Sequence, residues 1–186
     1  MTALLKMAAE AVTRVVLRCE KAQEDKQLDL SSCLLEAVPQ AVYHLLRNTE
    51  LSTLDLSHNA LTIISKKLPL KFPKVTALNV SDNKVEKLPD EINEMTLLET
   101  LNVSHNQLST LPESFYELPA LRILDLSHNV ITDLDASKLC GMPGIQEINL
   151  EHNPLPGDIC TQLLQLSQES NIKLLISEPP SSDHMD

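Results

Sequence analysis

LETLNVSHNQL (98–108) and LRILDLSHNVI (121–131) share one pattern: apolar residues alternate over a few positions, and an asparagine follows three residues after the last of them. Three further copies align with these two, namely LSTLDLSHNAL (51–61), VTALNVSDNKV (75–85) and IQEINLEHNPL (145–155). A degenerate earlier copy, LDLSSCLL (28–35), carries Cys33 where the others carry Asn. Equivalent apolar positions of successive copies are separated by 26, 24, 23, 23 and 24 residues. A period of this length indicates a solenoid in which each copy forms one coil.

The spacing within each copy predicts a short strand followed by a turn. Alternate residues of a strand lie on one face, so the apolar residues point into the solenoid and the residues between them point outward. The asparagine then hydrogen-bonds backbone groups of neighbouring coils that no β-ladder reaches. We expect this structural ladder to consist of Cys33, Asn59, Asn83, Asn106, Asn129 and Asn153.

The segments that connect the strands are predicted to be of two kinds. Leu88-Pro89 and Leu111-Pro112 indicate an extended, polyproline-like start, whereas Ser65 and Asp135 replace the proline in two other coils and permit a short helix. Stacked strands are about 4.8 Å apart, and the connecting segments need more room, which bends the stack. We therefore predict an α/β horseshoe with a parallel concave sheet of about six strands and helical caps at both ends.

A helical cap is predicted before the repeats, where the apolar interior of a solenoid would otherwise meet water. Apolar residues recur there at helical spacing: Leu4, Ala8, Ala11, Val12, Val15, Cys19 and Ala22. The charged residues fall mostly on the opposite side: Lys6, Glu10, Arg14 and Arg18. Because that side mixes charges of both signs, we favour a cap over a membrane-surface helix or an organelle transit sequence.

A second helix is predicted after the repeats. It starts at Gly157-Asp158 and ends at Asn171, and a final strand is expected over 174–176. Its apolar face consists of Ile159, Leu163, Leu164 and Leu166. The chain is thus divided into a cap (1–26), six repeats (27–156), a second cap (157–176) and a disordered tail (177–186).

The composition argues against several functional classes. A formal net charge of −11 opposes binding to nucleic acid or to an anionic membrane. No apolar run is long enough to span a bilayer, and charged residues interrupt the opening segment, so we expect no signal peptide. The four cysteines form neither CxxC pairs nor a Cys/His metal pattern. We expect no cofactor and no metal, and a location in the cytoplasm, with the nucleus as the alternative.

The chain resembles the short intracellular leucine-rich repeat proteins. Beyond the repeat motif LxxLxLxxNxL, the resemblance rests on KMAAEAVTRV before the repeats, LDLSSCLL as the first coil and HLLRN before the second. It covers nearly the whole chain, but only the repeat motif is highly specific. The resemblance implies a horseshoe fold that binds another protein, and it implies no catalytic residue.

Outward positions of the strands are the candidate binding residues. One outward column begins with Asp29 and Asp55, a second is formed mainly by serines (Ser31, Ser57, Ser81, Ser104, Ser127 and Glu151), and a third runs beside them from Thr53 to Glu147. Many of these residues are common choices in such repeats, so generic filler is an equal alternative. The less generic residues lie in the C-terminal half. The candidate binding set is Asp55, His58, Asn102, His105, Arg122, Ile123, Asp125, His128, Glu147, Asn149, Glu151 and His152.

Two clusters of side chains suggest other roles. Four histidines precede the ladder asparagines, and Asp82 interrupts their series. A shared metal ion and a pH-sensitive contact are alternatives to tolerated turn residues, and the last is favoured. Lys66, Lys67, Lys71 and Lys74 cluster in the second coil, where we expect solvated surface rather than a nucleic-acid patch.

A monomeric, non-catalytic scaffold that binds an unidentified protein on its concave face is the function that these features favour. An enzyme would need a nucleophile with a base, or paired carboxylates in a pocket, and no such set stands out from the repeat pattern. The alternative is a regulatory or targeting subunit of an enzyme or motor complex, such as a phosphatase, a ubiquitin ligase, a GTPase pathway or a dynein-like assembly.

Overall fold

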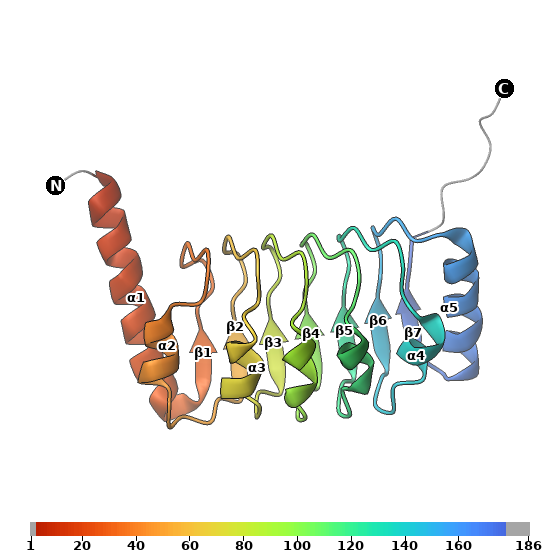
Figure 1. The fold of residues 1–186 in the computed structure, drawn as a ribbon, viewed down its shortest axis with the longest axis horizontal. Coiled ribbons are helices and arrows are strands. Elements are labelled where there is room, and N and C mark those ends of the chain that lie inside the picture. The colour runs from red at the N-terminus through yellow and green to blue at the C-terminus, as the bar shows by residue number, and fades with distance from the viewer. Residues whose placement is uncertain (1–2, 178–186) are drawn as a thin grey trace.

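The computed structural model describes the backbone of residues 3–177 and the side chains of residues 10–177. Within these residues, seven short strands form one parallel sheet in which each strand pairs with its neighbours in sequence. The strands are β1 (Gln27–Asp29), β2 (Thr53–Asp55), β3 (Ala77–Asn79), β4 (Thr100–Asn102), β5 (Ile123–Asp125), β6 (Glu147–Asn149) and β7 (Lys173–Leu175). They stand side by side in an open row (Figure 1). The strand expected over 174–176 is β7, shifted by one residue, and it extends the six strands of the repeats.

Equivalent residues of successive coils lie next to one another in the sheet. Across β4 and β5, for example, Thr100 lies opposite Ile123 and Leu101 lies opposite Leu124. The middle residue of each strand from β1 to β6 is buried. Each of these strands therefore has one inward apolar residue between two outward residues. Equivalent residues of successive strands form columns along the stack.

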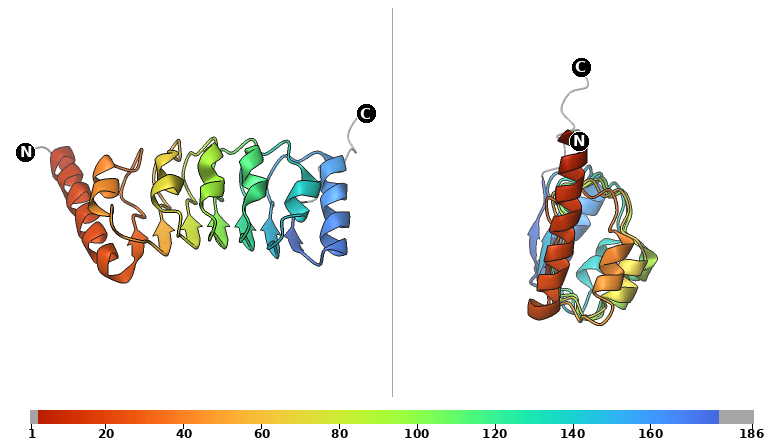
Figure 2. Two further views of the ribbon diagram at one scale, coloured as in Figure 1. Left: turned by 60° about the horizontal axis from the view of Figure 1, so that its bottom comes forward. Right: turned by 90° about the vertical axis from the view of Figure 1, so that its left-hand side faces the viewer.

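Short helices cover the side of the stack opposite the sheet (Figure 2). They are the α-helices α2 (Gln40–Leu45), α3 (Lys67–Lys71) and α4 (Ala136–Cys140) and the 3₁₀ helices η1 (Asp90–Glu94) and η2 (Glu113–Glu117). Both 3₁₀ helices follow a proline in extended conformation, Pro89 or Pro112. The α-helices α3 and α4 occur where Ser65 and Asp135 replace that proline, as the sequence predicts. The Asp135 carboxylate accepts a hydrogen bond from the Lys138 N–H and so caps α4.

One continuous apolar interior lies between the sheet and the helices. The strands contribute their middle residues, such as Leu101, and the helices contribute residues such as Leu68, Ile92 and Phe115, all of them fully buried. Because every coil shares this interior with the next, removal of one coil would expose the apolar faces of two others.

The ladder asparagine connects each coil to the one before it. The Asn106 Nδ2 atom donates to three carbonyl oxygens, those of Val103 and Ser104 in its own coil and that of Val80 in the preceding coil. Its Oδ1 atom accepts from the Val85 N–H at 2.8 Å. Asn59, Asn83, Asn129 and Asn153 repeat this arrangement.

Cys33 departs from the predicted ladder. Its backbone N–H donates to Asn59, but its thiol forms no bond to a backbone carbonyl and instead accepts a weak hydrogen bond from Arg18 at 3.4 Å. The Arg18 guanidinium donates to the Ser31 carbonyl at 2.7 Å, in the position where a ladder amide would donate. A residue that the sequence placed on the polar side of the first helix therefore completes the first coil.

The two ends of the solenoid are covered by the helices α1 (Ala3–Asp25) and α5 (Gly157–Glu169) (Figure 1). In α1, Val15, Cys19 and Ala22 are buried, but Val12, expected on the same face, is 65% exposed. The Leu4 and Ala8 side chains lie outside the described residues. None of the helices within residues 3–177 is both long and apolar enough to cross a membrane.

The C-terminal end of the solenoid differs from the prediction in the buried face of α5 and at Ser177. In α5, Leu163 is buried but Leu164 is 45% exposed, and Cys160 and Ser167 complete the buried face instead. Asn171 follows the helix in the left-handed backbone conformation that commonly ends helices. The Ser177 hydroxyl, at the start of the predicted tail, accepts a hydrogen bond from the His152 N–H. The rest of that tail, residues 178–186, lies outside the described residues.

We predict that Asn106→Ala lowers the free energy of unfolding by about 1–3 kcal/mol, because the buried Val85 N–H loses its acceptor. Chemical denaturation followed by circular dichroism would measure the loss. Gln107→Ala, at the exposed neighbouring position, is the control and should leave the denaturation midpoint nearly unchanged. Equal midpoints for both variants would contradict the structural role of the ladder.

Candidate interaction surface

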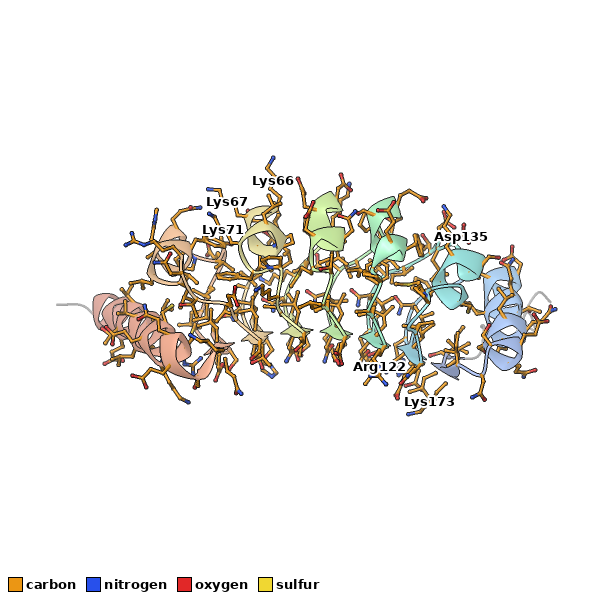
Figure 3. The ribbon with its side chains drawn as sticks, turned by 90° about the horizontal axis from the view of Figure 1, so that it is seen from below. Lys66, Lys67, Lys71, Arg122, Asp135 and Lys173 are labelled. Atoms are coloured by element: carbon orange, nitrogen blue, oxygen red, sulfur yellow. The ribbon has the colours of Figure 1, made fainter. Side chains whose placement is uncertain are left out.

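The outward residues of the sheet form a surface, here called the strand face, that none of the helices within residues 3–177 covers. Figure 3 shows Arg122 and Lys173 on this face, opposite the helices. Two columns build it along the seven strands. The first column is Gln27, Thr53, Ala77, Thr100, Ile123, Glu147 and Lys173, and the second is Asp29, Asp55, Asn79, Asn102, Asp125, Asn149 and Leu175.

Side chains of the second column also hold the turns that follow the strands. In each of the first six coils, the Asp or Asn Oδ1 atom accepts a hydrogen bond from the N–H two residues later, at 2.8–3.1 Å. Asp125 additionally accepts from the Ser127 hydroxyl at 2.7 Å. The predicted binding residues Asp55, Asn102, Asp125 and Asn149 thus each have one oxygen engaged in a turn.

The serine column is not outward, contrary to the sequence prediction. Ser57, Ser81, Ser104 and Ser127 are all less than 8% exposed. The alternation of a strand ends after three residues, and the turn that follows carries these serines inward. Their hydroxyls are therefore unavailable to a partner, whereas Glu151, at the equivalent position of the sixth coil, is half-buried.

A shallow hollow of about 490 Å³ lies on the N-terminal half of the strand face, over β1 to β4. Apart from Gln27 at its edge, the first-column residues that line it are small, namely Thr53, Ala77 and Thr100, and carboxylates of the second column lie beside them. The sequence pattern favoured the C-terminal half and did not predict this hollow. The run of small residues was visible in the sequence, but the space that they leave depends on their being neighbours in the sheet.

The C-terminal half of the strand face carries the larger side chains. Ile123 is 43% exposed and lies opposite Glu147 in the sheet. The Glu147 carboxylate accepts from the Lys173 ammonium at 2.8 Å, and the Arg122 guanidinium donates to the Gln146 side chain at 3.4 Å. The structure thus brings Arg122, Ile123 and Glu147 together as an apolar residue between charged ones.

The histidines form a stack at the edge of the strand face. The ring centroids of His105 and His128 are 4.0 Å apart, and those of His128 and His152 are 4.1 Å apart. His58 is separate from them, and its Nδ1 atom lies 3.5 Å from the Asp82 carboxylate. All five positions, Asp82 included, have a positive φ of 53–57°. Because His, Asp and Asn tolerate this left-handed conformation better than most residues, the backbone explains the series without a ligand.

Proton binding to the central histidine is disfavoured. Partial desolvation in the stack and the charges that His105 and His152 carry when protonated together lower the pKa of His128 below its usual 6.5, although Asp125 and Glu151 act in the opposite sense. Within residues 10–177, no group of three His, Cys, Asp or Glu side chains is arranged to hold a metal ion.

The cysteines offer no activated nucleophile. All four are buried with free thiols. Burial raises the pKa of each thiol, to about 11 for Cys19, so the reactive thiolate form is scarce at neutral pH.

The repeated coils, the asparagine ladder and the open strand face define a leucine-rich repeat protein. The family model for the leucine rich repeat matches residues 49–108, 73–129 and 96–155, which together cover more than half of the chain. The chain therefore belongs to the leucine-rich repeat family, whose members generally act as non-catalytic modules for protein–protein interaction.

Two relatives share the same name. The mouse leucine-rich repeat-containing protein 20 is 44% identical over 160 residues, which cover 84% of this chain and 87% of the relative. The human leucine-rich repeat-containing protein 20 is 32% identical over 100 residues, or 52% of this chain and 54% of the relative. Among solved structures, a leucine-rich repeat protein of Leptospira interrogans matches 74% of this chain with a TM-score of 0.65 and 26% identity. The matched region is 34% of that protein's length.

We predict that nuclear magnetic resonance titration of the His128 imidazole gives a pKa below 6.5. Replacement of both neighbours, His105→Asn and His152→Asn, should raise it, because the two adjacent charges are removed. Since the folded-state pKa lies below the unfolded value, the unfolded chain binds the proton more readily. This histidine should therefore lower stability as the pH falls below 6.5. A His128 pKa that is the same in both proteins would show that the stack does not act on it.

Proposed function

We propose that the chain is a non-catalytic adaptor that binds a partner protein on its strand face. The observation that carries this proposal is the register of the sheet, which sets polar side chains in parallel columns on a surface that no helix covers (Figure 2). A surface built in this way offers a partner many short side chains and few large ones that could anchor it. All four phenylalanines and tyrosines lie in or beside the helices of the opposite side: Tyr43, Phe72, Phe115 and Tyr116.

The C-terminal half of the strand face supplies the contacts most able to discriminate between partners. Ile123 offers an exposed apolar contact, and Arg122 and Glu147 flank it with opposite charges. Aromatic and arginine side chains usually dominate the energy of an interface. Because Arg122 is the only arginine among the candidate binding residues, which include no Trp, Tyr or Phe, a partner that brings its own large aromatic or arginine side chain fits this surface best.

The hollow of the N-terminal half complements these contacts. Thr53, Ala77 and Thr100 leave room for one large side chain of the partner. The neighbouring Asp55, which forms no ion pair among the described residues, favours a basic one, whereas Asp29 is already paired with Arg18 at 3.1 Å. The two halves of the strand face are therefore used together in one binding mode. The partner inserts a basic side chain at β1 to β4 and packs another side chain against Ile123 at β5.

Charge reversal on the strand face is the first test. We predict that Glu147→Arg combined with Ile123→Arg reduces the partners recovered by proximity labelling in cells by about tenfold, because an apolar contact and a complementary charge are lost. Asp125 is left intact, since its turn bonds make any change there a test of folding. The matched control reverses charge in η1 on the helix side with Glu94→Arg and removes an exposed apolar residue elsewhere with Leu97→Arg. Loss of partners in the control variant alone would mean that the binding surface lies on the helix side of the solenoid.

Filling the hollow is the second test. Ala77 is half-buried on β3, so Ala77→Phe should occupy the hollow without entering the core. We predict an unchanged denaturation midpoint and a loss of the same partners by proximity labelling. A matched addition of bulk outside the hollow, Val130→Phe at an exposed position, should keep the partners. Full recovery of partners by Ala77→Phe would show that the hollow is not used.

A further inference from the structure

The second coil is unusually basic for an acidic chain. The sequence contains 26 Asp and Glu residues, yet none occurs from residue 56 to residue 81. The same stretch carries four lysines: Lys66, Lys67, Lys71 and Lys74. These residues surround the short helix α3 on the side opposite the strand face, where Figure 3 shows Lys66, Lys67 and Lys71 together.

The geometry of α3 turns one lysine-rich surface toward solvent. Leu68 and Pro69 are buried against the core, while Lys66, Lys67, Leu70 and Lys71 are exposed. Residues three and four apart lie on the same face of a helix, so Leu70 neighbours Lys66 and Lys67 and is adjacent in sequence to Lys71. The exposed surface of α3 is therefore an apolar residue, 51% exposed, among three ammonium groups.

Carboxylates do not neutralise this surface. Among the described residues, Lys66 and Lys71 form no ion pair, and Lys67 donates to the neutral Gln40 side chain at 3.1 Å. Four other lysines are paired with carboxylates, as with Lys138 and Glu113 at 2.6 Å. Lys26, Lys84 and Lys87 form no ion pair among the described residues, but they are not gathered on one helix. Lys67 and Lys71 are also one helical turn apart, and such like charges repel each other. An anionic partner would relieve this repulsion.

A hollow beside α3 extends the same chemistry toward the first coil. It measures about 370 Å³ and is lined by Arg47, Leu70, Lys71 and Lys74, among other residues. Lys74 is paired there with Glu50 at 2.6 Å, whereas Arg47 forms no ion pair among the described residues. In the opposite direction the next helix, η1, carries Asp90, Glu91 and Glu94. The basic surface is therefore bounded, and it runs from α3 toward Arg47.

We propose that this surface, here called the lysine face (Arg47, Lys66, Lys67, Leu70 and Lys71), docks a short acidic segment of another protein. The acidic side chains contact the cations, and an aliphatic side chain rests on Leu70 in the hollow. At physiological ionic strength, charges interact over about 8 Å, so the lysine face acts locally despite the net charge of −11. The site is separate from the strand face, because α3 lies on the opposite side of the solenoid (Figure 3).

The size of the lysine face favours a peptide over a nucleic acid or a membrane. Those ligands present anionic groups over a wide area, and they would meet the carboxylates of η1 as well. An acidic peptide segment contacts a few cations and one apolar residue, which is what α3 and its hollow present.

The experiment uses a fluorescein-labelled, helix-forming peptide of glutamate with leucine at every fourth position, titrated with the full chain by fluorescence anisotropy. The first variant carries Lys66→Gln, Lys67→Gln and Lys71→Gln. Its matched control carries Lys21→Gln, Lys138→Gln and Lys173→Gln, which change the net charge equally at lysines that already have carboxylate partners. We expect the first variant to lose about tenfold in affinity, from three exposed charge contacts, and the control to lose less than about twofold.

The apolar contact has its own pair of variants. Leu70→Ser should weaken peptide binding severalfold, whereas Leu97→Ser, which removes a leucine of similar exposure in the third coil, should not. The Glu147→Arg, Ile123→Arg variant should bind the peptide normally, because the lysine face lies on the other side.

Several results would overturn the proposal. They are the absence of peptide binding to the unmodified chain, equal losses in the two lysine variants, or loss of peptide binding in the strand-face variant. Lysine-face-dependent binding of duplex DNA or phosphatidylserine vesicles that is tighter than peptide binding would also overturn it, in favour of those ligands. Circular dichroism of each variant checks that the fold is retained.

Discussion

The side-chain amide of the ladder asparagine is the contact on which the rest of the structure depends. Each coil makes a tight turn after its strand, and the turn leaves buried backbone groups that the β-ladder does not reach. The Asn106 amide satisfies four of them, two in its own coil and two in the preceding coil. A buried N–H or carbonyl without a partner is energetically costly. The stacking of neighbouring coils and the tight turn within each coil therefore depend on the same side chain. At the first coil, where the asparagine is missing, the Arg18 guanidinium supplies the donor instead.

The same turn decides which side chains remain available for binding. It requires a left-handed residue before the asparagine, which explains His105 and His128, and it engages the Asp125 carboxylate and its equivalents. The Asp and Asn side chains of the second column, which are candidate binding residues, therefore also hold the turns. The side chains least committed to the fold are those of the first column, from the small Ala77 to Ile123 and Glu147.

The two sides of the solenoid differ in chemistry because they are built by different parts of each coil. The strand face repeats two positions of a regular motif, and along its first column the residues change from small ones at β2 to β4 to a charged one at β6. The helix side is formed by the connecting segments, which vary in conformation and charge, from the lysines of α3 to the carboxylates of η1. The two sides therefore present surfaces of different chemistry, and we propose that each binds a different partner, as an adaptor requires.

The sequence by itself determined the repeating coils, the inward residues of the strands and the two short helices that occur where Ser65 and Asp135 replace proline, because these follow from spacing along the chain and from proline. It did not determine that Ser104 is buried, that Arg18 replaces a ladder amide, or that Thr53, Ala77 and Thr100 leave a hollow. Nor did it show that His128 is stacked between two histidines whereas His58 lies beside Asp82. Only the tertiary structure decided these, because each depends on contacts between residues distant in the sequence. Arg18 and Ser31 are 13 positions apart, and residues brought together by the register of stacked coils are more than 20 positions apart.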